Sequence, residues 1–343
     1  MRQKVHLTTH NFFKREYRLK CLPTFKKKAG NILPLLLLSF LSIVISILTV
    51  NQLEWEDHIS ITRGLVLFTS GLVFFSSLYL SINYIVIHTA SGRKIIKAYK
   101  LSYSDVYDIS NKQVSAVQAL FCCLTGITAV CYSCSRDILK TSHYISEAYA
   151  WFGAAYFFYD IWSMYKVYSS KVTLAQVNGD SKIDYFLVRF FKVIAYVKSN
   201  AVIVGHHIFI GGFGFLVITH LRGGLGGLFF RICASTPFVS LRGILSKIGM
   251  KNSTLYVANG LIMLVIFFLC RVAMFPYVIY MYAKTIDVDF LTALQSLPFG
   301  CQISIIVLLL PQIYWFLLMV SGATKVLKNS VSNNNFLKSI DRK

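Results

Sequence analysis

Long apolar stretches recur along the whole chain and are separated by polar connections that are rich in charge. A helix needs roughly 20 mostly apolar residues to cross about 30 Å of hydrocarbon. Eight stretches meet or approach that length: 31–50, 64–87, 114–134, 144–165, 201–219, 224–241, 255–283 and 301–320. The sixth is the weakest, because it begins with a glycine-rich run and contains Arg231 and Pro237. The pattern predicts an all-α fold, a polytopic transmembrane helical bundle or barrel of about seven to eight spans.

Basic residues are distributed unevenly over the connections between these stretches. Nine precede the first span, and further groups follow the second, fourth and sixth spans and occupy the C-terminal tail. The opposite connections hold the acidic residues Glu54, Glu56, Asp57, Asp137, Asp287 and Asp289. Because cytosolic loops carry the excess of Lys and Arg, we expect both termini to be cytosolic. Leaving out the sixth stretch would move the later basic loops to the wrong side, which favours counting it as a span.

Composition excludes several classes of protein. Of the 343 residues 55% are hydrophobic, and the mean hydropathy of +0.59 is too high for an ordinary soluble domain. The net charge of +21 follows the membrane topology, so we expect no nucleic-acid partner. The sequence has no phosphate-binding loop, dinucleotide fingerprint or nucleophile elbow, and Cys131 and Cys134 lack companions for a metal site. We therefore predict no metal and no bound cofactor, and any chemistry must take place within or beside the helices.

The charge and hydropathy patterns divide the chain into four parts. Residues 1–30 form a basic cytosolic arm, 31–63 an additional N-terminal membrane anchor with a lumenal loop, 64–325 the main membrane domain, and 326–343 a polar cytosolic tail. Within the tail we expect disorder over 329–335. In the connection before the fifth span, apolar residues recur at helical spacing over 183–197, which predicts an amphipathic helix at the membrane surface.

Three ionisable residues inside the apolar spans are candidates for catalysis. His206 and His207 stand side by side near the start of the fifth span, and Asp160 lies in the fourth span at a similar depth. An ionisable side chain at membrane depth costs on the order of 2 kcal/mol or more unless it meets a partner or a cavity. An imidazole can act there as general base, nucleophile or orienting donor, and an aspartate would fix its tautomer. The spacing fits equally well a structural hydrogen-bond cluster that holds helices together.

Polar and aromatic side chains in the later spans are candidates for substrate binding. They are Arg231, Ser235, Thr236, Arg271, Tyr314 and Trp315. Each arginine is suited to neutralise a carboxylate or to hold a lipid headgroup, and structural pairing is the simpler interpretation of each alone. The Ser-Thr pair precedes a proline, where hydroxyl groups can satisfy the backbone at a kink that opens space between helices. The aromatic pair either lines the same cavity or packs in the bundle.

Taken in order, these residues resemble the TLC-domain family, in particular the TLC domain-containing 3 branch, which is related in fold to ceramide synthases. The resemblance extends over 64–325 and is carried by Trp151 with Tyr159-Asp160, His206-His207, Leu221-Arg222-Gly223 with Leu225-Gly226, the run 235–241, Cys270-Arg271, Phe275-Pro276 and the run 311–316. The ordered set is far more specific than any one motif. It implies a helical barrel in the endoplasmic reticulum with a lipid-accessible chamber near the paired histidines.

The resemblance also implies a reaction. Ceramide synthases of this fold transfer a fatty acyl group from acyl-CoA to a sphingoid amine, and by position His206 and His207 would be the catalytic pair, supported by Asp160. The expected partners are membrane lipids, a sphingoid base and acyl-CoA as co-substrate, with a homodimer or heterodimer left open. Two departures support the alternative, a non-catalytic lipid-binding protein that regulates membrane composition. Cys233 replaces a glutamate that the family often has, and no Asp or Glu occurs between His207 and Lys251.

Overall fold

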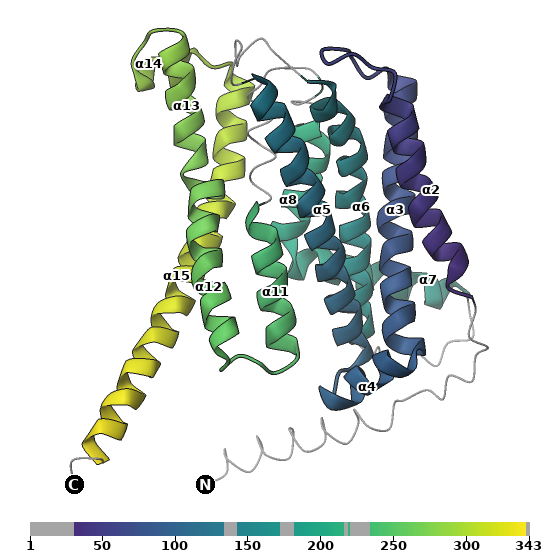
Figure 1. The fold of residues 1–343 in the computed structure, drawn as a ribbon, viewed down its shortest axis with the longest axis vertical. Coiled ribbons are helices and arrows are strands. Elements are labelled where there is room, and N and C mark those ends of the chain that lie inside the picture. Colours follow the sequence, from purple (N-terminus) through teal and green to yellow (C-terminus); the bar gives the residue numbers. More distant parts are fainter. Residues whose placement is uncertain (1–30, 134–142, 172–181, 216–218, 220–233, 341–343) are drawn as a thin grey trace.

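The computed structural model describes residues 31–133, 143–171, 182–215, 219 and 234–340, and the regular elements in these ranges are all helical (Figure 1). In chain order they are α2 (Leu33–Val50), α3 (Ile61–His88), α4 (Ala90–Ala98), α5 (Tyr103–Ser133), α6 (Tyr144–Lys171), α7 (Lys182–Ser199), α8 (Ala201–Phe209), the π-helical turn η1 (Ile210–Gly214), α11 (Thr236–Lys247), α12 (Thr254–Phe267), the π-helical turn η3 (Phe268–Val272), α13 (Met274–Thr285), α14 (Phe290–Ser296) and α15 (Phe299–Ile340).

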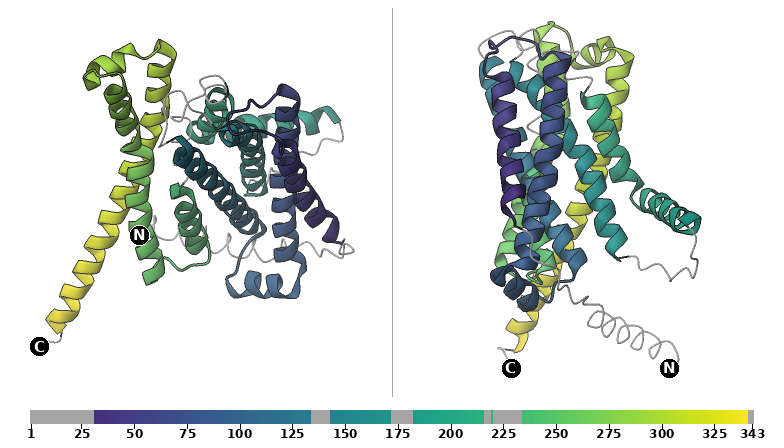
Figure 2. Two further views of the ribbon diagram at one scale, coloured as in Figure 1. Left: turned by 45° about the horizontal axis from the view of Figure 1, so that its top comes forward. Right: turned by 90° about the vertical axis from the view of Figure 1, so that its right-hand side faces the viewer.

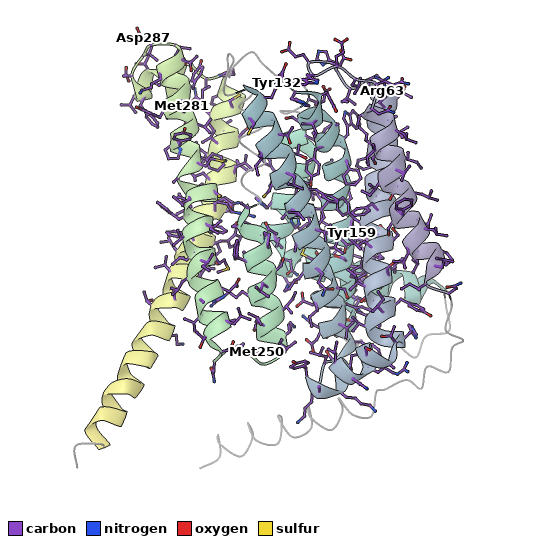
Figure 3. The ribbon with its side chains drawn as sticks, in the orientation of Figure 1. Arg63, Tyr132, Tyr159, Met250, Met281 and Asp287 are labelled. Atoms are coloured by element: carbon purple, nitrogen blue, oxygen red, sulfur yellow. The ribbon has the colours of Figure 1, made fainter. Side chains whose placement is uncertain are left out.

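The long helices run roughly along one axis and alternate in direction. The start of α2, the short helix α4 and the end of α15 lie at one end of the bundle (Figure 1), and Met250 in the turn between α11 and α12 lies at the same end (Figure 3). Arg63, Tyr132 and Asp287 lie at the opposite end (Figure 3). The basic residues of α4, and Lys251 beside Met250, therefore share one end of the molecule. Which side of a membrane this end faces stays a prediction.

Several helices have the dimensions and composition of membrane spans. By these criteria four segments can cross a membrane, namely Leu33–Val50, Ile61–His88, Thr254–Thr285 and Phe299–Lys325, and a fifth is obtained if α7 and α8 form one broken span. Helices α5 and α6 are as long as these spans but more polar, and much of α6 is buried. These findings support a multi-pass membrane protein, whereas the number of seven to eight spans stays a prediction.

An aromatic core lies between α3, α5 and α6. Its buried rings include Phe74, Phe75, Tyr79, Phe152, Tyr156 and Tyr159. Glycines bring α3 close to α6: a methyl group at Gly64 would overlap the ring of Trp151, and one at Gly71 would overlap the backbone carbonyl of Phe152. Such small residues allow two membrane helices to approach with little loss of packing. The close α3–α6 pair fixes the part of α6 that carries Asp160.

Helix α7 leaves the bundle and lies across the direction of the long helices, as the right-hand view of Figure 2 shows. It meets α8 at an angle of 90°. The amphipathic helix predicted for 183–197 is thus confirmed as a helix, and its place at a membrane surface stays a prediction. Tyr196 is buried against Tyr165 and Tyr168 of α6, whereas Phe190 and Phe191 are exposed. The contact through Tyr196 anchors α7 just before the chain enters α8.

At the C-terminal end, the prediction of disorder over 329–335 is wrong. Helix α15 continues from the last apolar span as far as Ile340. Extending an existing helix by one residue costs far less than starting a new one, so a polar sequence that follows directly on a span can continue it. The basic arm 1–30 lies outside the described residues.

Candidate functional site in the bundle interior

Asp160 is the centre of a buried polar cluster to which three helices contribute. Asp160 is next in sequence to Tyr159, which lies in the middle of the bundle (Figure 3). Its side chain is buried, with only 4% of the residue exposed. Its Oδ1 accepts a hydrogen bond of 2.7 Å from Nδ2 of Asn111 on α5. Its Oδ2 lies 3.4 Å from Nε2 of His207 on α8. One carboxylate on α6 therefore joins α5 and α8.

The amide of Asn111 is held in turn by hydroxyl groups of α6. Its Oδ1 accepts hydrogen bonds from the Tyr159 hydroxyl at 3.0 Å and from the Ser163 hydroxyl at 2.6 Å. All of these side chains are buried. A buried charge is tolerated when neighbouring dipoles and hydrogen bonds replace the water it has lost. We call Asn111, Tyr159, Asp160, Ser163 and His207 the Asp160 cluster.

The two nitrogen atoms of His207 have different surroundings. The side chain is 9% exposed, with its ring centroid 5.6 Å from that of Phe157. Nε2 faces Asp160, whereas Nδ1 is buried and has no hydrogen-bond partner among the described residues. Most buried polar atoms in proteins are hydrogen-bonded, so an exception of this kind requires an explanation. An imidazole with one nitrogen against a carboxylate and the other unoccupied has the arrangement of a general base.

His206 faces a different part of the bundle. Its ring is 6.0 Å from that of His207 and meets the ring of Trp315 edge-on at 5.1 Å. Adjacent residues on a helix point about 100° apart, which separates the two imidazoles in this way. His206 therefore connects α8 to α15, and His207 connects α8 to α6.

A second polar cluster surrounds Arg271. Its Nε and Nη2 donate hydrogen bonds of 2.8 Å each to the hydroxyls of Ser235 and Thr236, and its Nη1 donates one of 3.3 Å to Oε1 of Gln312. We call these four residues the Arg271 cluster. Arg271 lies in the π-helical turn η3, and π-helical turns occur frequently at functional sites. The charge of Arg271 acts on His206 and on His207, and helix α15 contacts both His206 and Arg271, so the two clusters are neighbours in the bundle.

Comparison with known families identifies the domain. The family model of the TLC domain matches residues 108–321. The matched part is more than half of the chain and contains both clusters. The chain belongs to the TLC-domain family. No solved structure matches it.

The geometry of this TLC domain can now be compared with the predicted site. The structure gathers most of the candidates around the two clusters: Asp160, His206, His207, Ser235, Thr236, Arg271 and Trp315. Tyr314 is 54% exposed, and it is its neighbour Trp315 that meets His206. Arg231, Cys233 and the motif at 221–226 lie outside the described residues. The catalytic and binding roles of these side chains stay predictions.

The sequence did not single out four members of the TLC-domain site as candidates. Ser163 follows Asp160 by one helical turn, and Tyr159 and Gln312 stand out only as parts of family motifs. Asn111 was overlooked because the predicted span began at residue 114, and the charged neighbour Lys112 marks the end of that apolar window. A polar amide within a helix that extends beyond its apolar window is the signal that would have found Asn111.

Proposed function

We propose that this TLC-domain protein is a ceramide synthase-like enzyme, which transfers an acyl group from acyl-CoA to the amino group of a sphingoid base. The proposal rests chiefly on one observation, the buried pair of Asp160 and His207 in which Nδ1 of the imidazole is left without a partner. The membrane-spanning helices and the family membership support a lipid substrate. The resemblance of the histidine motif to the TLC domain-containing 3 branch and to ceramide synthases supports the reaction type.

The chemistry follows from the two nitrogen atoms of His207. The amine nitrogen of the acceptor attacks the thioester carbonyl while Nδ1 takes up one of its protons. As the tetrahedral intermediate collapses, the carbon–sulfur bond breaks and the imidazolium returns the proton to the departing thiolate. Asp160 stabilises the imidazolium through Nε2. The positive charge of Arg271 stabilises the negative charge that develops on the carbonyl oxygen.

The end of the bundle that carries α4 and Lys251 is proposed to face the cytosol, with both termini on that side and the protein in the endoplasmic reticulum. The basic residues of this end support that orientation. It would also allow water-soluble acyl-CoA to reach the site from the cytosol. Protease protection of tags placed at each terminus in sealed microsomes tests the orientation, because tags on the cytosolic side are digested.

Turnover by the purified protein tests the proposed reaction. The full chain in lipid nanodiscs is given sphinganine and labelled acyl-CoA, and the N-acylated product is measured. We expect wild-type activity and a loss of about a hundredfold or more in His207→Ala, because a positioned general base contributes that much. His88→Ala, at the end of α3, is the matched control and should retain activity. Equal activity of His207→Ala and wild type would refute the proposed role of His207.

A second candidate function is non-catalytic lipid binding that regulates membrane composition. It is favoured by the sequence after His207, which has no Asp or Glu from residue 208 to residue 286. Asp160 is therefore the carboxylate on which acid–base chemistry at the described site would depend. In that case wild type would bind sphinganine in nanodiscs without forming product. His207→Ala would then change affinity for the lipid rather than a rate. Product formation by wild type would exclude this candidate.

A further inference from the structure

The orientation of the Asn111 amide is determined by its neighbours. The oxygen of an amide side chain accepts hydrogen bonds and its nitrogen donates them. Because the carboxylate of Asp160 can only accept hydrogen bonds, the nitrogen of the Asn111 amide is turned toward it, and the hydroxyl groups of Tyr159 and Ser163 contact Oδ1 as donors. The reverse orientation would place two oxygen atoms, one of them charged, against each other. The amide is therefore locked with its donor on Asp160.

This lock divides the two oxygen atoms of Asp160 between two partners. Oδ1 is occupied by the amide of Asn111 at 2.7 Å. Oδ2 is the oxygen that faces Nε2 of His207 at 3.4 Å. A carboxylate accepts but does not donate hydrogen bonds, so it favours the imidazole tautomer whose hydrogen is on Nε2. The lone pair of that tautomer is on Nδ1, the atom that has no partner in the described structure.

We propose that Asn111 is a positioning residue, which directs Oδ2 of Asp160 to Nε2 of His207 and so keeps Nδ1 as the proton acceptor. The proposal rests on the function proposed above, and it adds a residue on α5 that never touches the reacting atoms. Asn111 acts through Asp160, and the hydroxyls of Tyr159 and Ser163 act through Asn111. Side chains of α5 and α6 together thus determine which ring nitrogen of His207, on α8, carries the hydrogen.

Nitrogen-15 NMR of labelled histidines tests this proposal directly, because each tautomer gives distinct shifts for protonated and unprotonated ring nitrogens. The full chain is measured in lipid nanodiscs at neutral pH, and His207→Gln identifies the signals of His207. We expect His207 of wild type to show hydrogen on Nε2 alone, and Asn111→Leu to show a mixture of both tautomers. Hydrogen on Nδ1 in wild type, or one unchanged tautomer in Asn111→Leu, would overturn the proposal.

A matched control separates this effect from a general disturbance of α5. Gln118 is a buried amide on the same helix, and its Nε2 donates to the Tyr149 hydroxyl rather than to Asp160. Gln118→Leu should leave the tautomer of His207 as it is in wild type. If Gln118→Leu and Asn111→Leu gave the same mixture, the effect would come from helix packing, and the proposal would be wrong.

A second variant keeps both Asn111 and Asp160 and covers the case in which Asn111→Leu does not fold. The double change Tyr159→Phe with Ser163→Ala removes the two donors to Oδ1 of Asn111, so the amide still faces Asp160 but loses the contacts that hold it in place. We expect mixed tautomers and a kcat lower by about tenfold to a hundredfold, with KM unchanged, because the base is misaligned while the substrate still binds. A wild-type tautomer in this variant would contradict the proposal. The tautomer of His207 tests the role of Asn111 even if the wild type shows no turnover. A lack of turnover would refute only the proposed reaction.

Discussion

The Asp160 cluster and the Arg271 cluster both hold an ion among apolar helices, but they hold it in different ways. Asp160 lies on a long regular helix, and its carboxylate is shared between one amide and one imidazole. Arg271 lies in a π-helical turn, and its guanidinium is bound by hydroxyls just before Pro237 and by an amide of α15. The carboxylate of Asp160 is thus held on a regular helix, whereas the guanidinium of Arg271 is held where helices are irregular.

This difference separates two kinds of function within one site. The partner of Asp160 on α8 is itself titratable, so the Asp160 cluster can exchange a proton with a substrate. Arg271 donates hydrogen bonds to the neutral side chains of Ser235, Thr236 and Gln312, and its guanidinium keeps its charge at any physiological pH. We therefore expect changes at the Asp160 cluster to alter proton transfer most. Changes at the Arg271 cluster should alter both the stabilisation of the carbonyl oxygen and the assembly of α11, η3 and α15.

The largest effect on stability is expected from removal of the guanidinium. Arg271→Met leaves the polar atoms of Ser235 and Gln312 without this donor inside the bundle, which should cost about 3 kcal/mol of unfolding free energy. Arg271→Lys should cost less, because an ammonium group can keep one or two of these hydrogen bonds but cannot reproduce the fork. Unfolding curves in mixed micelles with increasing denaturing detergent measure both. Arg93→Met, on the exposed helix α4, is the control, and equal stability of Arg271→Met and Arg93→Met would contradict the role assigned to Arg271.

A smaller effect should distinguish two neighbouring aromatic residues of α15. Trp315 meets the ring of His206 edge-on, and Tyr314 is 54% exposed. Trp315→Leu should lower the unfolding free energy by about 1 kcal/mol, the usual value of an aromatic pair, and should also lower turnover by changing the position of His206. Tyr314→Leu should stay within about 0.5 kcal/mol of wild type, as exposed positions usually do. If Tyr314→Leu had the greater effect, α15 would present the opposite face to α8.

Much of the fold could be predicted from local sequence. Apolar windows located α3, α6 and the segment from α12 to α13, since burial or contact with lipid depends on composition over roughly 20 residues. The sixth predicted span, 224–241, lies largely outside the described residues. Similar depth in two spans also suggested that Asp160 and His207 meet, and the structure brings them to 3.4 Å. This worked because a helix rises by a fixed 1.5 Å per residue, so depth can be read from position once the ends of a span are known.

The rest depended on contacts between distant parts of the chain. No local pattern shows that Asn111 would donate to a carboxylate 49 residues later, or that two hydroxyls of α6 would bind its oxygen. The same holds for Gln312, whose partner Arg271 is on another helix. The helical tail to Ile340 was missed for a different reason, because polar composition favours disorder only where no adjacent helix can extend into it.

The smallest effect is expected at the charged pair that joins α5 to α11 outside the predicted spans. Nζ of Lys247 lies 2.8 Å from Oδ1 of Asp105 and 3.4 Å from Oδ2 of Asp108. These groups are partly exposed, so Lys247→Met should cost only about 0.5 kcal/mol. Lys251→Met, in the exposed turn that follows α11, is the matched control and should not change stability.

The pH dependence of this small difference follows from the two pKa values. Burial would raise the pKa of Asp105, but hydrogen bonds from Lys247 and Ser102 outweigh it and lower that pKa. Burial would lower the pKa of Lys247, but the bond to Asp105 and the two carboxylate charges outweigh it and raise that pKa. The Asp105 contribution is lost as pH falls through its lowered pKa, and the Lys247 contribution as pH rises through its raised pKa. The stability difference between Lys247→Met and wild type should therefore be constant from about pH 6 to 9 and shrink on acidification below about pH 4. A difference that already changes between pH 6 and 8 would instead indicate a contribution from a histidine.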